Sequence, residues 1–415
     1  MSNALTPDIR FKGFTDDWVK HLISELGRIE TGNTPPTANK SFYEDDGFLW
    51  VTPSDITEDI IKSTAKQLSA KGKKEARIAG ANSILCTCIA SIGKNAFTPT
   101  ECAFNQQINA VLPFVDYDPY FLFVDSFNWS KIMKRNAGAL TFQIVNKAEF
   151  STIETIIPQE IIEQRKIASL IYKLNELIGF NINECKKIMD IKKSMLINMF
   201  PQGDEKVPRI RFKGFSGDWN YLDLGSMGKT YTGLSGKTKE DFGHGDATYI
   251  TYMNVFTNPI TNPLQVDSIE SDAMQNEVQE GDIFFTTSSE TPEEVGMSSV
   301  LLAKSGTTYL NSFCFGYRLN ENVKIDKYYL AYLLRSSVVR EKIVFLAQGI
   351  SRFNISKTKM MEIAIPVPEK TEEQEKIGAF FFNLDKLIEA QEKKIAQLKN
   401  IKSALLNKMF SKGDE

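Results

Sequence analysis

The sequence predicts an α+β fold in which two similar globular domains are separated by two long antiparallel coiled-coil helices. Two repeated strings lead to this prediction. PDIRFKGFTDDW begins at Pro7 and returns, as PRIRFKGFSGDW, at Pro208, 201 positions later. EQRKIASLIYKLNELI begins at Glu163 and returns, as EQEKIGAFFFNLDKLI, at Glu373, 210 positions later. Because such an internal repeat is the mark of a duplicated unit, we expect a pseudo-twofold arrangement of four segments, alternately globular and helical: 1–158, 159–204, 205–368 and 369–415.

The globular segments combine strand and helix signals. Short apolar or β-branched runs, bounded by turn-forming residues, predict strands within 48–56, 81–93, 247–255 and 281–289. Two longer amphipathic runs predict matching helices at 120–135 and 328–347. Proline neither continues a strand's hydrogen-bond ladder nor fits inside a helix, so Pro158 and the pair Pro366 and Pro368 mark the end of each globular segment.

A heptad seam runs along each predicted long helix, with alternating spacings of four and three residues. In the first helix its members are Ile167, Ile171, Leu174, Ile178, Asn181, Cys185, Ile188, Lys192, Met195 and Met199. In the second they are Ile377, Phe381, Leu384, Ile388, Gln391, Ile395, Leu398, Lys402, Leu405 and Met409. About 40 residues give each helix a length of about 60 Å. The alternative is two unrelated helices, each packed on its own domain, but the shared heptads and shared polar breaks favour helices that pack on each other.

The path of the chain predicts the direction of that pairing. The first helix ends near Phe200 and the second globular segment begins by Pro208, so an antiparallel pair requires only that this segment sit at the far end of the helices. The expected result is a dumbbell, with two heads on a two-helix rod. The most symmetric register pairs residues whose numbers sum to 576, which sets Ile188 against Ile388. In that register we expect the two seam lysines to run their stems along the seam and place their charges in water.

Composition narrows the class of protein. The 415 residues carry a net charge of −3, which is ordinary for a globular protein and lower than in many nucleic-acid-binding domains. The stretch 62–77 is a local exception, with six basic residues and one acid. No apolar run reaches the roughly 20 residues of a membrane span, and the start has no signal-peptide pattern. Five cysteines and two histidines form no zinc set, so we expect reduced thiols and a cytoplasmic protein.

Several local strings, taken in order, resemble the specificity (S) subunits of type I restriction-modification enzymes. They are Ile9–Phe14 with Trp18, Thr31–Gly32, Ser91–Lys94, Asn105–Gln107 and the Glu-Gln-X-Lys-Ile opening of each long helix. The resemblance covers nearly the whole chain, and the duplicated order is more specific than any single string. The second half departs from the pattern at Glu293–Gly296 and at Asn311–Phe313.

The resemblance implies a function and a set of partners. Each globular segment would be a target-recognition domain that reads one half of a bipartite, asymmetric site on double-stranded DNA. The paired helices would fix the spacer between the half-sites and dock two modification (methyltransferase) subunits, on which restriction and translocation subunits assemble. The chain itself would hold no metal or cofactor, and S-adenosylmethionine, ATP and Mg²⁺ would be bound by the partner subunits.

Catalytic motifs are missing from the sequence, which agrees with a non-catalytic subunit. Asn258–Pro259 and Asn262–Pro263 do not continue into the Asn/Asp-Pro-Pro-Tyr/Phe string of an adenine methyltransferase. Gly236–Thr238 is no phosphate-binding loop, because the earlier glycine of that motif is replaced by Tyr231. Two alternatives stay open: the specificity subunit of a related system that cuts on both sides of its site, and a coiled-coil scaffold whose heads bind proteins.

Base edges in the major groove are read by Arg, Lys, Asn, Gln, Ser and Thr, while phosphate contacts set the register of the protein on DNA. In the first globular segment the candidates are a basic loop, Lys71, Lys73, Lys74 and Arg77, and a polar turn, Ser91, Lys94 and Asn95. In the second they are Thr287, Ser288, Ser289, Arg352 and Asn354. The last two lie in the string GISRFNIS, which copies GALTFQIV of the first segment and its candidate Gln143. For Asn105, Gln106 and Gln107 we expect structural hydrogen bonding.

Overall fold

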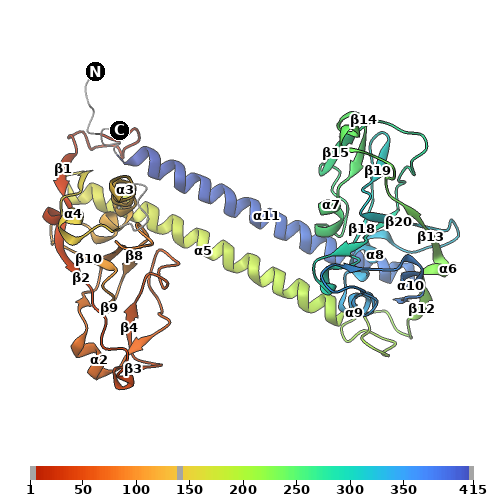
Figure 1. The fold of residues 1–415 in the computed structure, drawn as a ribbon, viewed down its shortest axis with the longest axis horizontal. Coiled ribbons are helices and arrows are strands. Elements are labelled where there is room, and N and C mark those ends of the chain that lie inside the picture. Colours follow the sequence, from red (N-terminus) through yellow and green to blue (C-terminus); the bar gives the residue numbers. More distant parts are fainter. Residues whose placement is uncertain (1–5, 138–143, 411–415) are drawn as a thin grey trace. The chain divides into compact units, whose positions relative to one another are not determined.

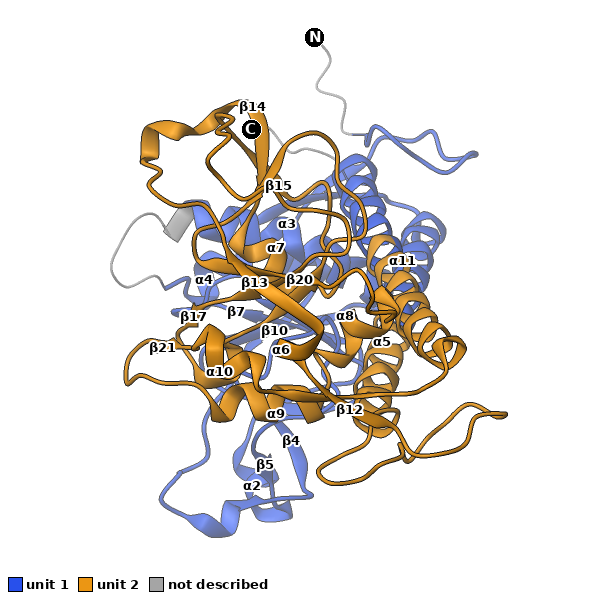
Figure 2. Ribbon diagram, turned by 90° about the vertical axis from the view of Figure 1, so that its right-hand side faces the viewer, with its two compact units in different colours: residues 1–181, 394–415 blue, residues 182–393 orange. Residues whose placement is uncertain are grey.

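The computed structural model describes residues 6–137 and 144–410. The chain forms two compact units, each of which combines a globular head with part of the long helices α5 (Ile161–Asn198) and α11 (Thr371–Met409) (Figure 2). Unit 1 holds residues 1–181 and 394–415, and unit 2 holds residues 182–393. We call the globular part of unit 1 that precedes α5 head one, and the globular part of unit 2 between α5 and α11 head two.

Head one is built on three sheets. A strand pair joins β1 (Val19–Leu22) to β11 (Glu154–Ile157). A four-stranded antiparallel sheet has the order β2 (Gly27–Thr31), β10 (Ile108–Pro113), β7 (Ser83–Thr87), β8 (Asn95–Thr98). The third sheet has the order β3 (Tyr43–Glu44), β5 (Gln67–Leu68), β4 (Phe48–Val51), β9 (Cys102–Phe104), β6 (Ile78–Ala79). The helices are α1 (Ile23–Leu26), η1 (Lys40–Phe42), α2 (Ala70–Glu75), α3 (Pro119–Ala137) and α4 (Lys147–Ser151).

Head two repeats this plan. β12 (Asn220–Asp223) pairs with β22 (Ala364–Val367), and the four-stranded sheet has the order β13 (Gly228–Thr232), β20 (Cys314–Leu319), β16 (Ile283–Thr286), β18 (Ser298–Val300). The third sheet has three strands, in the order β15 (Val266–Ile269), β14 (Phe242–Ile250), β19 (Thr308–Leu310). An additional pair joins β17 (Ser288–Ser289) to β21 (Phe353–Asn354). The helices are α6 (Leu224–Met227), η2 (Lys239–Asp241), α7 (Tyr252–Thr257), η3 (Pro292–Glu294), α8 (Lys327–Leu333), α9 (Ser337–Phe345) and α10 (Lys357–Met361). The internal repeat is therefore a repeat of strand order as well as of sequence.

One predicted helix of head two is interrupted. Where head one has the single helix α3, head two has α8 and α9, so the prediction of one helix over 328–347 was wrong. The break has a local cause. Ser336 adopts extended backbone with φ −71° and ψ 158°, as residues that precede a helix do, and its hydroxyl donates to the Leu333 carbonyl at 2.6 Å.

In each unit the beginning of one long helix packs against the end of the other. In unit 1, Ile167 near the start of α5 shares a core with Met409 and Phe410 at the end of α11. In unit 2, Ile377 near the start of α11 shares a core with the Met199–Phe200 pair that ends α5. The two helices therefore run antiparallel, as predicted (Figure 1), and the alternative of two unrelated helices is wrong.

The heptad seam is the inward face of both helices. Each seam position is buried or half-buried, whereas most positions between them are exposed. Asn181 is the buried polar member: its amide nitrogen donates to the Leu177 carbonyl at 2.7 Å, while its Oδ1 has no partner within the described residues. A buried oxygen of this kind costs about 1–3 kcal/mol. A polar residue in a coiled-coil seam lowers the stability of the helix pair but specifies its register.

The two seam lysines are neutralised rather than left in water. Nζ of Lys192 forms an ion pair with Oδ1 of Asp385, on the opposite helix. In unit 1, Nζ of Lys402 lies 3.0 Å from Oδ2 of Asp59, a residue of head one. The position on α5 that matches Asp385 is Asn175, so the carboxylate comes from the head instead. The expectation of two water-exposed charges was wrong, because a carboxylate lies beside each ammonium group.

The Met-Phe string that ends each long helix packs into a head. Phe410 stacks on Phe121, with ring centroids 5.6 Å apart, and lies edge-on to Trp18 at 6.3 Å. Phe200 lies edge-on to Trp219 at 6.5 Å. Both phenylalanines are buried. The end of α11 thus completes the core of head one, which also contains Trp18 and Phe121.

Candidate nucleic-acid interface

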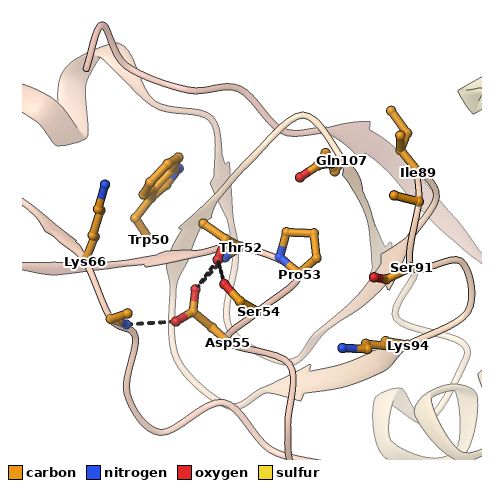
Figure 3. Close-up of a pocket in the computed structure, with 12 residues that line it drawn as sticks. Trp50, Thr52, Pro53, Ser54, Asp55, Lys66, Ile89, Ser91, Lys94 and Gln107 are labelled. Atoms are coloured by element: carbon orange, nitrogen blue, oxygen red, sulfur yellow. Dashed lines mark hydrogen bonds between the residues drawn. The ribbon is translucent and has the colours of Figure 1, made fainter. Parts of the chain in front are cut away.

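Head one contains a pocket of about 580 Å³ beside the turn that follows β7 (Figure 3). One wall is the turn Thr52–Asp55 that follows β4, and another is the segment Ile89–Ser91 with Lys94. Trp50, Ala65, Lys66 and Gln107 complete the lining. The pocket therefore gathers side chains from three strand ends at one edge of the head, and two residues of the predicted polar turn, Ser91 and Lys94, are among them.

The turn between β7 and β8 is held in a constrained shape. Ala90 has a φ of +61°, a left-handed conformation that alanine rarely adopts. Gly93, with φ +78°, lies so close to α3 that a Cβ there would meet the Cβ of Ser130 at 2.9 Å. Backbone strain that the surrounding structure enforces is common at ligand-binding sites. The turn is for this reason a candidate contact loop.

The polar groups of the pocket divide into engaged and open ones. Asp55 is engaged, because its two carboxylate oxygens accept the backbone N–H groups of Thr52 and Ala65, both at 2.8 Å. Within residues 6–137 and 144–410, neither Nζ of Lys94 nor Nε2 of Gln107 takes part in a hydrogen bond or ion pair. Gln107 was not among the candidate base readers from the sequence. Its signal was its polarity just ahead of the apolar strand β10, and that position favoured a structural role.

Three residues of the predicted basic loop, Lys71, Lys73 and Lys74, lie in the short helix α2, so the prediction of a loop was wrong for them; Arg77 follows the helix. Ser69 caps the helix, since its Oγ accepts the N–H of Gly72 at 3.2 Å. Gly72 is required by packing rather than by a turn, because a Cβ there would lie 2.0 Å from the Phe42 carbonyl oxygen.

The four basic residues of this segment differ in availability. Lys71 and Lys74 are exposed on α2. Lys73 lies over the Phe48 ring, 3.8 Å from its centroid, and 3.4 Å from Glu101. Nη1 of Arg77 donates to a backbone carbonyl at 2.5 Å. Lys71 and Lys74 are therefore the better candidates for phosphate contacts.

Asn95 does not fit the predicted base contact. It is buried in β8, and its amide nitrogen donates to the Ser126 carbonyl at 2.8 Å and to Oγ of Ser130 at 2.7 Å. These bonds tie β8 to α3, which explains the polar residue. Asn105 has the structural role expected of it, because its Oδ1 accepts the N–H of Gln107 at 2.9 Å. Gln143 lies outside the residues that the structure describes.

In head two the strand pair β17 and β21 brings the predicted residues together. Ser288 pairs with Asn354 in this ladder, and Thr287 immediately precedes it. Ser288 and Ser289 are buried, at 5% and 6% exposure, whereas Arg352 and Asn354 are exposed. The structure assembles the candidates at one edge, but Arg352 and Asn354 are the members that reach solvent.

Two arginines that the sequence analysis did not single out support the loops of head two. Arg340 donates to the carbonyls of Glu293, Val295 and Gly296 at 2.7–2.8 Å. Arg335, in the break between α8 and α9, donates to the last carbonyls of α7 at 2.8–3.2 Å. Burial lowers the pKa of Arg335 to about 9 and that of Arg340 to about 10, so both stay charged at neutral pH. Their signal in the sequence is two arginines within a mostly apolar run, 328–347.

Neither a metal-ligand cluster nor a helix fit to span a membrane occurs among the described residues. Over residues 6–137 and 144–410, no three His, Cys, Asp or Glu side chains are placed to bind a metal ion together. None of the helices in that part of the chain combines the length and apolarity of a membrane span. The five cysteines are buried free thiols, and burial raises the pKa of Cys88 to about 12 and that of Cys102 to about 11.

Comparison with known sequences finds one family, twice. The type I restriction modification DNA specificity domain matches residues 15–190 and 216–400. The specificity subunit of the MjaIX type I restriction enzyme of Methanocaldococcus jannaschii is 24% identical over 95% of this chain and 92% of its own length. The specificity subunit of the HindI type I restriction enzyme of Haemophilus influenzae is 32% identical over 43% of this chain, which spans 40% of that subunit.

Solved structures share the fold. A type I restriction-modification S subunit from M. genitalium matches with a TM-score of 0.59 at 16% identity, covering 99% of this chain and 100% of that one. A chain from a structural study of type I system assembly and conformational transition matches with a TM-score of 0.57 at 17% identity, covering 95% and 97%. Since the family matches most of the sequence and the fold agrees, this chain belongs to the type I restriction-modification DNA specificity family, with two copies of its domain.

Proposed function

We propose that this chain is the DNA sequence recognition subunit of a type I restriction-modification enzyme. The observation that carries the proposal is the family match in two copies, together with two heads of the same strand order. Each head reads one half of a bipartite, asymmetric site on double-stranded DNA. Because the heads share a frame but differ in their loops, the two half-sites have different sequences.

The long helices have two tasks in this proposal. They fix the number of unread base pairs between the half-sites, and they dock two methyltransferase subunits, on which restriction and translocation subunits assemble. A single helix register supports the first task, since a rod of one length sets a spacer of one length. The ion pair between Lys192 and Asp385 and the buried Asn181 favour one register over others.

The chain itself carries out no chemical step in this proposal. S-adenosylmethionine, ATP and Mg²⁺ are bound by the partner subunits, and the complex acts in the cytoplasm. What this chain supplies is position: polar and basic side chains at the pocket of head one, Lys71 and Lys74 on α2, and Arg352 and Asn354 on head two.

Exchange of a head tests the proposal. The chain is produced with its methyltransferase subunits in a host that lacks adenine methylation, and methylated adenines are mapped across the genome. Residues 20–150 are then replaced by the same segment of another family member. One half of the methylated site should change, while the other half and the spacer should stay the same.

Two results would contradict the proposal. If both half-sites change, or neither does, the heads do not read separate half-sites. If no sequence-specific methylation or binding appears with the partner subunits present, the chain is better described as a coiled-coil scaffold. Methylation with cleavage on both sides of the site by one partner chain would place the subunit in the related class of systems instead.

A further inference from the structure

The two heads hold their contact turns in the same backbone frame. In head one, the N–H of Thr87 donates to the Lys94 carbonyl and Oγ1 of Thr87 accepts the Lys94 N–H, both at 2.9 Å. In head two, Thr286 makes the same two bonds with Met297, at 2.9 and 3.0 Å. Lys94 and Met297 therefore occupy one structural position.

A second position is matched as closely. The N–H of Gln107 donates to Oδ1 of Asn105 at 2.9 Å, and the N–H of Phe313 donates to Oδ1 of Asn311 at 2.8 Å. The Gln107 carbonyl accepts the N–H of Cys88, just after β7, at 2.8 Å. The Phe313 carbonyl accepts the N–H of Thr287, just after β16, at 2.9 Å. Phe313 is thus the counterpart of Gln107.

A third position follows from the strands β4 and β14. The Val51 carbonyl accepts the N–H of Asn105, and the Ile250 carbonyl accepts the N–H of Asn311, both at 3.0 Å. The two strands therefore end at matching residues. Three residues further on lie Ser54 in head one and Met253 in head two.

The chemistry at these three positions is opposite in the two heads. Head one presents the polar trio Ser54, Lys94 and Gln107, all of which line its pocket. Head two presents the apolar trio Met253, Met297 and Phe313. Met253 is 51% exposed and Phe313 is 56% exposed, whereas Met297 is half-buried. Exposed apolar side chains gathered at one site indicate a surface that a partner covers.

We propose that the two heads read their half-sites by different chemistry at the same structural position. The polar trio of head one forms hydrogen bonds with purine edges, and the apolar trio of head two contacts the C5 methyl groups of thymines in the major groove. The methyl group is the one apolar feature that base pairs display there. This inference rests on the proposed function and goes beyond it by assigning a class of base contact to each head.

Charges around the apolar trio support a base-edge contact rather than a backbone contact. The loop that contains Met297 also carries the exposed carboxylates Glu290, Glu293 and Glu294, which repel phosphate. The exposed Arg352 immediately precedes β21, which pairs with β17 at the start of this loop, and its positive charge is suited to a phosphate contact. A protein docking partner has no comparable reason to meet a polar trio in one head and an apolar trio in the other.

Uracil substitution tests the inference. The full chain, in complex with its methyltransferase subunits, is assayed for binding to duplexes that carry its methylated site. Thymines of the half-site read by head two, identified by the head exchange, are replaced one at a time by uracil, which lacks only the methyl group. Burial of one such group contributes about 0.8 kcal/mol, so each contacted thymine should lose about fourfold in affinity.

Variants assign the effect to named residues. In Phe313→Ala or Met253→Ala, at least one uracil penalty should fall to about onefold, while Met274→Ala, a 93% exposed methionine of the same unit, should leave every penalty unchanged. In the other half-site, 7-deazapurines, which lack the N7 acceptor, should weaken binding at a position that becomes insensitive in Gln107→Ala or Lys94→Ala. Thermal unfolding is followed in parallel to show that each variant is folded.

Each result decides the inference. If uracil is neutral throughout the half-site of head two, if that half-site contains no A·T pair, or if the penalties survive in both Phe313→Ala and Met253→Ala, the apolar reading is overturned although specific binding persists. If no duplex is preferred over random sequence, the proposed function itself fails.

Discussion

Nε of Arg10 donates to Oε1 of Glu163 at 2.6 Å, and Nη2 donates to Oε2 of the same carboxylate at 2.8 Å. The copy of this pair, Arg211 with Glu373, has distances of 2.7 and 2.9 Å. Both glutamate side chains are almost fully buried, at 1% and 2% exposure. Each of the two repeated strings thus supplies one partner of a bidentate ion pair: the first supplies the arginine and the second the glutamate. The pair forms once in each unit.

Loss of this pair should destabilise unit 1. Replacement of one partner leaves the other charge buried and unpaired, which costs about 3–5 kcal/mol. We expect Arg10→Met to lower the free energy of unfolding of unit 1 by that amount, measured by urea denaturation with a probe in head one.

The exposed pair Lys20 with Glu154 provides the control. Its side chains are 50% and 55% exposed, so Lys20→Met should cost less than about 1 kcal/mol. Equal effects of the two substitutions would show that the buried pair has no special role.

The repeat and the long helices were predictable because each depends on a local sequence pattern that occurs in both halves. Their direction followed from the path of the chain between them. The ion pair of Arg10 with Glu163 joins positions 153 residues apart, and no periodicity relates them; the duplication marked both strings but not their contact. The same holds for Lys402 and Asp59, whose pairing depends on a head loop that lies beside α11 only in the folded unit.

The candidate site was predictable in part. Polar residues at strand ends indicated Ser91 and Lys94, and the structure places both at the pocket. Residue type alone did not distinguish Asn95, which bonds to α3, from an open base reader. It also did not distinguish a helix from a loop at Lys71–Lys74, because the close packing of Gly72 against Phe42 is a tertiary contact.

The end of the chain should stabilise its beginning. Phe410 is buried against Trp18 and Phe121, and truncation of a buried phenylalanine typically costs about 3–5 kcal/mol. We expect Phe410→Ala to destabilise head one by about this amount, seen as faster proteolysis within residues 19–157.

Ile401→Ala is the matched substitution on the exposed face of α11, since Ile401 is 50% exposed. It should leave proteolysis of head one unchanged. Destabilisation confined to head two after Phe410→Ala would contradict the packing described here.

Cysteine pairs should report the helix register. Lys192 pairs with Asp385, and burial, with a smaller contribution from the charge of Glu392, raises the pKa of Cys185. The numbers of Lys192 and Asp385 sum to 577, one step from the sum of 576 that defines the symmetric register. With the native cysteines replaced, Ile188→Cys with Ile388→Cys should therefore crosslink under mild oxidation.

Two further pairs exclude other arrangements. Ile188→Cys with Ile395→Cys corresponds to a slip of one heptad and should not crosslink. Ile167→Cys with Ile377→Cys joins the starts of the two helices, so a crosslink there would mean a parallel pair.

Lys94 and the lysines of α2 should differ in their effect on DNA binding. If Lys94 contacts a base, Lys94→Ala should cost about 1–3 kcal/mol and relax one position of the half-site. If Lys71 and Lys74 contact phosphates, each alanine substitution should weaken binding to all sequences alike and reduce the salt slope by about one. Affinity and salt dependence measured on specific and random duplexes separate the two cases, and unchanged affinity in all three variants would remove both segments from the interface.

Arg340 should be a positioning residue for the contact loop of head two. Its guanidinium binds the carbonyls of three residues within 293–296 from the side of α9, where Val295 also packs into the core. Arg340→Met keeps the length of the side chain but removes these donors, so amide hydrogen exchange in residues 291–297 should accelerate while β13 and β20 stay protected.

Arg340→Met should also broaden the sequence preference of head two, because the loop positions Met297 of the apolar trio. The sequence preference of head one should stay the same. Arg340→Lys is the matched variant. It keeps the charge but not the planar fork that reaches several carbonyls at once, so it should restore the exchange rates only in part. A purely electrostatic role for Arg340 would instead predict full rescue by lysine, and unchanged exchange in Arg340→Met would show that the loop is held by its own backbone.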